Sequence, residues 1–427
     1  MCEKRASSAM HRFSIEMIPK RSWQMSEKRR FTLFFMIVAL QNMAASFAHP
    51  VTPTLFKGLQ LSDSMFGLVL AAMLTVNFLF SPFWGKISTY ISSRNTLMIC
   101  NIGYAVGQLF FGLAKTSGQF LLARMFAGIF TGGNTVGALT YIVNTSPDTK
   151  SRERHLVISA TLLSVCGSFG FFVGGMLGEI HVYVAIAAQV GTLATCGVLY
   201  RLVCKDDTML PLRGVNRKEL VRQANPFEAF VQSGKFMTVT LAFLFAMCAL
   251  QNLCQTTFDQ SFNYYAIDQI GFSTGYNGAV KFVMGITTLI ANSTLCMWIM
   301  NRTDTNKSII AIMLCCCVTM AIILMLDALV PYLIANVLYF AMSSISVPIL
   351  QNMVAEVGRR GDSNLIMGFY NAMKSLGGIF GALIAGLTYA INPRMPFICC
   401  LIAFAIAALC GVVYARRSSA ARKVNGV

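Results

Sequence analysis

Long apolar segments follow one another along almost the whole chain, and this succession constrains the fold more than any other feature. A helix needs about 20 apolar residues to cross the hydrocarbon core of a bilayer, and the segments have about that length. Hydrophobic residues make up 56% of the 427 residues and charged residues only 12%, whereas soluble domains contain about 25% charged residues. The sequence therefore predicts an all-α polytopic membrane protein.

The apolar segments divide into twelve predicted transmembrane helices. They span residues 31–55, 64–84, 96–114, 119–143, 155–178, 181–203, 236–258, 275–300, 308–327, 330–354, 364–389 and 395–415. The short loops between most of them leave no room for a soluble catalytic domain. The spans contain no paired acids, zinc-type His/Glu motif or nucleophile elbow, and the chain has no nucleotide-binding loop. We therefore expect neither an enzyme nor an ATP-driven pump.

The longest polar interval separates the sixth predicted helix from the seventh and divides the chain into two halves. The halves share sequence, since Ala-Leu-Gln-Asn-Met at 39–43 returns as Ala-Leu-Gln-Asn-Leu at 249–253, an offset of 210 residues. We predict a duplicated six-helix unit. Its parts are a cytoplasmic extension at 1–30, an N-terminal bundle at 31–203, a basic cytoplasmic linker at 204–235, a C-terminal bundle at 236–415 and a cytoplasmic tail at 416–427.

The formal charge of +17 raises the question of a nucleic-acid partner, which the distribution of the charge answers. Most lysines and arginines flank the predicted helices on one side of the membrane, whereas the other side carries Lys57, Lys115 and Arg394. This asymmetry follows the positive-inside rule and predicts cytoplasmic termini. We expect a multi-pass plasma-membrane protein with no nucleic-acid partner.

The chain has 14 cysteines, which lie mostly inside apolar segments, where cysteine behaves as a small hydrophobic residue. No Cys-x-x-Cys pair stands beside a histidine. The sequence therefore predicts no metal site and no cofactor.

Amides inside the predicted helices indicate a polar cavity. We single out Gln41, Asn42, Asn134, Gln251 and Asn252 as candidate substrate-binding residues. An amide in a bilayer needs a partner or water, so it belongs on a face turned toward other helices or a cavity. We expect the first, fourth, seventh and tenth helices to line this cavity. The alternative is that some of these amides only hold helices together.

The loop after the second predicted helix resembles the signature loop of the major facilitator superfamily. Gly85, Lys86 and Arg94 match that pattern, whereas Thr89 stands where the family usually has aspartate and Ser92 where it has a second glycine. By resemblance, this loop is a cytoplasmic turn that latches neighbouring helices in one of two bundle positions. Gly85, Lys86 and Arg94 are our candidates for the conformational switch.

Further motifs resemble the same superfamily. Arg124 and Gly128 in the fourth predicted helix are similar to its arginine-x-x-x-glycine segment. Glycines in the fifth helix resemble those of bacterial drug/proton antiporters, although Phe171 replaces the usual proline. The resemblance covers about residues 31–415 and implies two six-helix bundles that work by alternating access. The alternative for the glycines is plain helix packing.

The repeat places two titratable residues at matching depths. His49 and Asp259 are 210 residues apart, in the first and seventh predicted helices. Histidine changes charge near physiological pH, so we consider His49 and Asp259 as the proton-coupling pair. Alternatively, both residues lie in a wet outer mouth, or His49 is present because of the kink expected before Pro50.

Three cations lie in the membrane interior, more than one helical turn from either end of a predicted helix: Arg124, Lys281 and Lys374. Charges in a membrane interior are costly and mark a functional site or a pair. Asp259 is the acid best placed to oppose them. The excess of these cations over acids in the membrane interior favours an anionic, zwitterionic or neutral amphiphile as substrate. Arg124 and Lys374 are among the residues expected to bind it.

The leading hypothesis is therefore a secondary transporter that exports a small amphipathic molecule, coupled to protons or another ion. We expect it to act as a monomer in the bilayer. A lipid or glycolipid flippase is the alternative among transporters. A transporter-like sensor that binds a ligand without transporting it is the alternative from another class.

Overall fold

The computed structural model describes residues 26–207, 224–358 and 363–424, and all regular elements in these ranges are helices. The N-terminal half contains α1 (Glu27–Ala45), α2 (Thr52–Gly58), α3 (Met65–Ile91), α4 (Ser93–Leu113), α5 (Ser117–Thr145), α6 (Thr149–Ile180) and α7 (Val182–Val203). The C-terminal half contains α9 (Glu228–Gln232), a 3₁₀ turn (Ser233–Lys235), α10 (Val239–Asp268), α11 (Thr274–Ala291), a π turn (Asn292–Cys296), α12 (Met297–Arg302), α13 (Thr305–Met325), α14 (Leu329–Gly358), α15 (Ser363–Tyr389) and α16 (Met395–Val424). The predicted extension up to residue 25 and most of the predicted linker lie outside the described residues.

Within the described ranges, 11 helices are long and apolar enough to cross a membrane. The eighth span joins α11, the π turn and α12 into one rod, Thr274–Arg302. The first span is α1 followed by α2, and α1 starts in a charged turn that begins at Glu27. The predicted all-α fold with twelve spans is thereby confirmed.

The first span is interrupted at residues 46–51, where α1 has ended and α2 has not begun. Pro50 lies in this interruption and has no N–H to continue a helical hydrogen-bond ladder. Pro53 stands in the first turn of α2, where the missing N–H costs little. The break frees the backbone carbonyl of His49, which accepts a hydrogen bond of 3.0 Å from Asn263 Nδ2 in the other half.

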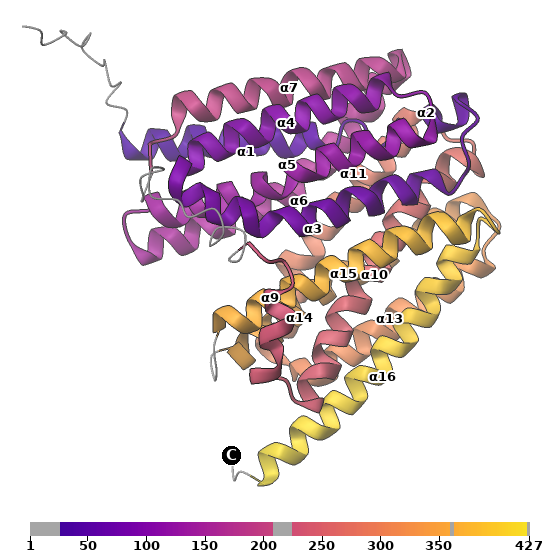
Figure 1. Cartoon of the computed structure of the whole chain (residues 1–427). Helices are drawn as coiled ribbons and strands as arrows, with labels where there is room; N and C mark the ends of the chain where they lie inside the picture. Colours follow the sequence, from indigo (N-terminus) through magenta and orange to yellow (C-terminus); the bar gives the residue numbers. More distant parts are fainter. Residues whose placement is uncertain (1–25, 208–223, 359–362, 425–427) are drawn as a thin grey trace, which may run out of the picture.

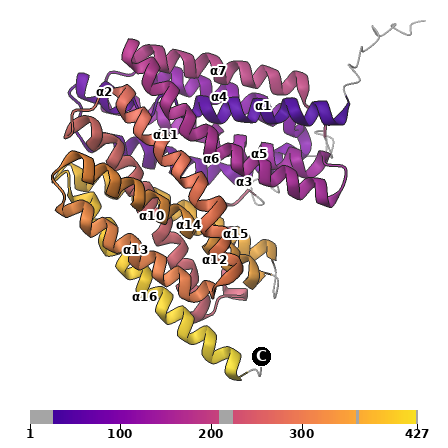
Figure 2. The same ribbon diagram turned by 180° about the vertical axis from the view of Figure 1, so that it is seen from behind.

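The helices form two bundles, one from each half of the chain (Figure 1). The bundles meet near α2 and the ends of α10 and α15, and they diverge toward the start of α1 and the end of α16 (Figures 1 and 2). We call the meeting region, around residues 46–67 and 264–278, the closed end. The opposite region is the open end.

Glycines allow close helix contacts at matching positions in the two bundles. A Cβ on Gly170 of α6 would collide with the carbonyl oxygen of Met43 on α1. A Cβ on Gly381 of α15 would lie 2.5 Å from the carbonyl oxygen of Leu253 on α10. Met43 and Leu253 are 210 residues apart, so the sequence repeat coincides with a repeated packing contact.

Other glycines bring the two bundles together at the closed end. A Cβ on Gly175 of α6 would lie 3.1 Å from the Cα of Gly278 on α11, and the reverse distance is 3.2 Å. Gly67 of α3 and Gly386 of α15 approach each other in the same way. Larger side chains here would push the bundles apart, because interiors pack too densely to absorb them.

An ion pair also joins the bundles at the closed end. Lys57 Nζ, in the last turn of α2, lies 2.5 Å from Asp268 Oδ1 at the end of α10. The Tyr389 hydroxyl of α15 donates a hydrogen bond of 2.8 Å to the other carboxylate oxygen of Asp268. Asp268 therefore has partners from both bundles.

Candidate functional site

Two polar cavities lie between the bundles, and the first contains Lys374. The Lys374 cavity has a volume of about 270 Å³. Its walls come from α3 of the N-terminal bundle and from α10 and α15 of the C-terminal bundle: Leu74, Asn77, Asn252, Thr256, Asn371, Lys374, Ser375 and Gly378. Because both bundles line this cavity, a movement of one bundle relative to the other would change its shape.

Lys374 has no acid among the residues that line its cavity. Its ammonium lies 5.3 Å from the centre of the Tyr370 ring, a cation–π contact one helical turn away. Its backbone oxygen accepts a hydrogen bond of 2.6 Å from Asn252 Nδ2. Asn77, on the opposite wall, is held by a hydrogen bond of 2.8 Å from its Nδ2 to Thr131 Oγ1. The cavity therefore presents amides and one uncompensated cation.

The second cavity contains Asp259. The Asp259 cavity has a volume of about 220 Å³ and takes its walls from α6, α10, α11 and α14 and from Ser46 beside α1. The lining residues are Ser46, Gly167, Ser168, Phe171, Gln255, Asp259, Lys281, Gly285, Thr288, Phe340 and Ser344. Like the first cavity, it has contributions from both bundles.

Asp259 forms an ion pair with Lys281 across α10 and α11. The Lys281 side chain is 4% exposed, whereas that of Asp259 is 32% exposed. Three phenylalanine rings surround the ammonium, with centres at 5.2 Å for Phe262, 5.6 Å for Phe340 and 5.8 Å for Phe171. Both charges stand out in the sequence, but their pairing was not predicted. The pairing could have been predicted from the rule that a buried cation requires a partner.

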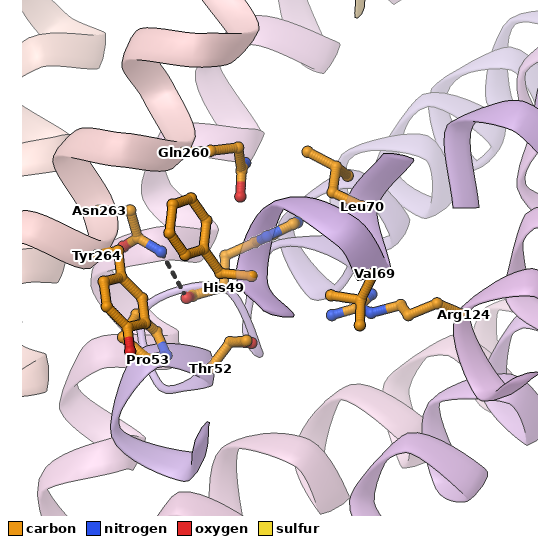
Figure 3. Close-up of a pocket in the computed structure, with 10 residues that line it drawn as sticks. His49, Thr52, Pro53, Val69, Leu70, Arg124, Gln260, Asn263 and Tyr264 are labelled. Carbon is orange, nitrogen blue, oxygen red and sulfur yellow. Dashed lines mark hydrogen bonds between the residues drawn. The ribbon is translucent and has the colours of Figure 1, made fainter. Parts of the chain in front are cut away.

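His49 lies beside this pair. Its ring stacks on Phe171, with centres 5.3 Å apart and planes at 12°. His49 also lines a cavity of about 20 Å³, room for about one water molecule, together with Arg124 and Gln260 among others (Figure 3). Phe171, which stands where the sequence resemblance would place a proline, thus contacts both His49 and Lys281. The coupling role of His49 and Asp259 stays a prediction.

Arg124 is buried in α5, with an exposed fraction of 5%. Its guanidinium carbon lies 4.0 Å from the centre of the Phe111 ring, and its Nη1 lies 3.7 Å from Met73 Sδ. The phenol of Tyr104 lies next to it. No described acid forms an ion pair with it, and its Nε has no hydrogen-bond partner in the described part of the chain. Arg124 therefore adds an uncompensated positive charge next to His49.

A family model described as Major Facilitator Superfamily matches residues 34–346. The chain belongs to the major facilitator superfamily. Over 388 residues it is 22% identical to multidrug resistance protein 1 of Bacillus subtilis (strain 168), an alignment that covers 89% of this chain and 95% of the relative. It is also 26% identical to quinolone resistance protein NorA of Staphylococcus aureus (strain MRSA252) over 151 residues, 35% of this chain and 37% of the relative.

Solved structures of the same superfamily fold resemble the chain. A bacterial homologue of the human lysosomal transporter Spinster, described as inward-facing and unoccupied, has a TM-score of 0.73 at 15% identity and covers 91% of this chain and 97% of its own. The human organic anion transporter MFSD10 has a TM-score of 0.64 at 18% identity, with coverages of 91% and 100%. At these identities the likeness shows the fold.

Three of the five candidate amides, Gln41, Asn134 and Gln251, lie inside the bundles and line neither the Lys374 cavity nor the Asp259 cavity. Gln41 Oε1 accepts a hydrogen bond of 3.1 Å from Asn101 Nδ2, and Asn134 Oδ1 accepts one of 2.9 Å from the same group. Gln251 Nε2 donates to the Ser343 carbonyl oxygen at 3.0 Å. These amides hold helices together in this conformation, because a buried amide must find partners.

The two remaining candidate amides, Asn42 and Asn252, have different surroundings. Asn42 Nδ2 donates to the carbonyl oxygen of Val38 in its own helix at 2.9 Å. Asn252 lines the Lys374 cavity. Asn252 is the one of the five candidates that lines the same described cavity as Lys374. Its contact with a substrate stays a prediction.

The superfamily signature loop departs from its pattern in sequence and keeps a sharp turn at Ser92. Gly85 and Lys86 lie in α3, and the chain turns at Ser92, which has φ 69° and ψ 150°. Glycine adopts this region far more readily than other residues. Ser92 stands where the superfamily has its second glycine, so the turn is retained at a cost in backbone strain.

Two aspartates that follow α7, Asp206 and Asp207, bind the residues of this turn. Asp207 accepts hydrogen bonds from Ser93 N at 2.7 Å and from Ser93 Oγ at 2.6 Å, and Asp206 pairs with Arg94. Asn144 Nδ2, near the end of α5, donates to Asp207 at 2.9 Å. A carboxylate at a helix N-terminus is favoured by the helix dipole. Sequence reasoning missed both acids, because they follow the sixth span and not the loop.

Proposed function

We propose that the chain is a secondary transporter that exports a small amphipathic compound by alternating access. The observation that carries this proposal is the Lys374 cavity, which lies between two bundles that touch at the closed end and diverge toward the open end (Figure 1). A site of this kind faces one side of the membrane at a time, and rocking of the bundles exposes it to the other side. The names of the relatives, which concern drug resistance, favour export.

In this proposal the open end faces the cytoplasm and the chain lies in the plasma membrane. Arg29 and Arg30 stand at the start of α1, and Arg416 and Arg417 near the end of α16. All four belong to the open end, whereas the closed end carries Lys57. The positive-inside rule favours this orientation.

The preferred substrate has an anionic group, or is zwitterionic or neutral. Lys374 and Arg124 have no acid in an ion pair among the described residues, and Asp259 is already paired with Lys281. A cationic compound would meet like charge at Lys374, which is unfavourable at a site of low dielectric constant.

Protons are the proposed coupling ion, with Asp259 as their carrier and His49 beside it. Replacing Asp259 by Asn removes a proton-binding group and keeps its shape. We expect Asp259→Asn to abolish gradient-driven transport and to spare exchange. Unchanged pH dependence in both Asp259→Asn and His49→Gln would assign the coupling elsewhere.

The test is flux through the purified full chain in proteoliposomes. Labelled benzenesulfonate (anionic), tryptophan (zwitterionic) and benzenesulfonamide (neutral) are compared with and without an imposed pH gradient. Protein-dependent flux that responds to the gradient supports the proposal. Binding without net flux would favour a transporter-like sensor, and movement of a fluorescent phospholipid alone would favour a flippase.

A further inference from the structure

The small cavity that contains Arg124 lies across the boundary between the two bundles, next to the closed end (Figure 3). We call it the Arg124 cavity. One wall comes from the break after α1 and from α2, α3 and α5, and the other wall comes from α10 of the C-terminal bundle. Its volume of about 20 Å³ suits a water molecule or a monatomic ion. An organic cargo molecule does not fit.

Several polar side chains of the Arg124 cavity already have hydrogen-bond partners. The Thr52 hydroxyl donates to a backbone oxygen of its own turn at 2.7 Å. Asn263 Nδ2 donates to the backbone oxygen of His49 at 3.0 Å, and the Tyr264 hydroxyl donates to Asp63 at 2.6 Å. These groups are therefore not available to an occupant of the cavity.

Three polar side chains remain for an occupant. In the part of the chain that the structure describes, the Gln260 amide and the His49 imidazole form no hydrogen bond, and Arg124 Nε has no partner. All three side chains line the Arg124 cavity, and none of them is an acid. Together they offer N–H donors around a positive charge, which is the chemistry of an anion site.

The charge of Arg124 requires a counterion. Its side chain is 5% exposed, and the described ion pairs do not include it. Arginine keeps its proton in proteins, so it cannot become neutral as a buried lysine can. Its contact with the Phe111 ring offsets part of the cost of burial, but a buried unpaired charge remains unfavourable.

The acids of neighbouring elements have other partners. Asp63 accepts the hydrogen bond from Tyr264, and Asp259 is paired with Lys281 at its own cavity. Neither of these acids lines the Arg124 cavity. The compensating charge therefore has to come from solution.

We propose that the Arg124 cavity is a chloride site. Chloride supplies the single negative charge that Arg124 lacks, and it is a monatomic ion only slightly larger than water. The Arg124 guanidinium donates hydrogen bonds to it from the N-terminal bundle, and the Gln260 amide donates from the C-terminal bundle. This inference goes beyond the proposed function, because chloride occupies a site of its own and is not the cargo.

A chloride in this position connects the two bundles. Arg124 belongs to α5 and Gln260 to α10, so separation of the bundles at the closed end would part the two donors and admit water. A ligand shifts an equilibrium toward the conformation that it binds better. Chloride should therefore favour the conformation in which this end is closed, and its concentration should control how often this end opens.

The first test is equilibrium binding of radioactive chloride to the full chain in nanodiscs, with gluconate replacing chloride at constant ionic strength and pH. The wild type should show saturable binding. Bromide should compete with chloride, whereas sulfate, a larger ion, should not. Arg124→Gln should lose affinity about tenfold or more, and Gln260→Ala about fivefold, because each removes a donor. Lys115→Gln is the matched control, since Lys115 is an exposed cation outside the cavity.

Melting curves protect this test against a folding defect. A ligand that binds only the folded chain stabilises it, so chloride should raise the melting temperature of the wild type above that in gluconate. Arg124→Gln should melt at the same temperature in both salts, and in gluconate no lower than the wild type, because it buries no unpaired charge. Arg124→Lys keeps the charge and should retain a weaker response to chloride.

The bridge between the bundles has a test of its own. With spin labels at Gln60 and Ile391, on opposite bundles at the closed end, the short-distance population of the wild type should be larger in chloride than in gluconate. Arg124→Gln should give the same distances in both salts. Equal wild-type distributions in the two salts would reject the bridge.

The outcomes separate this inference from the proposed function. Absent chloride binding in the wild type, or equal binding by the wild type and Arg124→Gln, would overturn the chloride site even if the chain transports its cargo. Chloride binding that depends on Arg124, without flux of any cargo, keeps the site and rejects transport.

Discussion

The hydroxyl of Tyr264 in α10 donates a hydrogen bond of 2.6 Å to Asp63 Oδ1, which precedes α3 by two residues and belongs to the other half of the chain. The same ring stacks on Phe66 of α3, with centres 4.6 Å apart. Tyr264 is 1% exposed. One residue of the C-terminal bundle thus makes both a polar and an apolar contact with the N-terminal bundle at the closed end.

The Tyr264→Phe substitution should weaken the closed end without removing the ring contact. Loss of a hydrogen bond costs about 1 kcal/mol, which shifts a two-state population about fivefold. Spin labels on noncanonical residues at Gln60 and Ile391 would report the distance across this end, and their longer-distance population should grow. Tyr276→Phe is the matched control because Tyr276 is 69% exposed. Equal distance distributions in both variants would assign no gating role to the Tyr264 hydroxyl.

The Ser92→Gly substitution should stabilise the protein. Ser92 has φ 69° and ψ 150°, a region costly for residues with a Cβ, so glycine should raise the free energy of unfolding by about 1 kcal/mol. The neighbouring Ser93→Gly change should have the opposite sign, because it removes the Oγ hydrogen bond to Asp207. Thermal unfolding in one detergent compares the two. Destabilisation by Ser92→Gly would show that the turn is not strained.

Much of the fold was predictable from the sequence, because membrane spans are defined by length and apolarity. The contacts between spans were not. Adjacent residues of a helix point about 100° apart, and a span that is apolar on all sides gives no sign of which face is buried. Gln251 and Asn252 illustrate this, since one lies inside its bundle and the other lines a cavity. Whether Lys281 and Asp259 face each other depends in the same way on how α11 and α10 are rotated about their axes, which the sequence does not show.

These two adjacent amides offer a paired prediction. Gln251→Ala should leave the Ser343 groups without their donor and lower stability by about 1–3 kcal/mol, with an unchanged apparent substrate constant. Asn252→Ala should raise the substrate constant several-fold and lower the melting temperature less, because the side chain borders a cavity and is partly exposed. Melting curves and concentration-dependent flux measure both effects. The reverse pattern would restore Gln251 as a substrate ligand.

Lys374 provides the last prediction, because its cavity offers a cation and no acid. If it attracts the anionic cargo, Lys374→Met should raise the apparent constant for benzenesulfonate at least tenfold and leave that for benzenesulfonamide nearly unchanged. Lys374→Arg should be intermediate, since it keeps the charge and changes the geometry. The pH dependence of flux should stay as in the wild type, because the proposed proton carrier is Asp259 and not Lys374.

Two further roles for Lys374 give different results in the same flux and melting experiments. A structural cation solvated by the cavity predicts that Lys374→Met leaves flux intact and raises thermal stability, because removal of a costly buried charge can stabilise a protein. A part in the bundle movement predicts equal losses for the anionic and the neutral compound. An anion-binding role requires that Lys374→Met affect benzenesulfonate more than benzenesulfonamide, because the substitution removes a positive charge that attracts only the anionic compound. Equal losses would therefore reject Lys374 as the cargo's partner, whatever the outcome at Asp259.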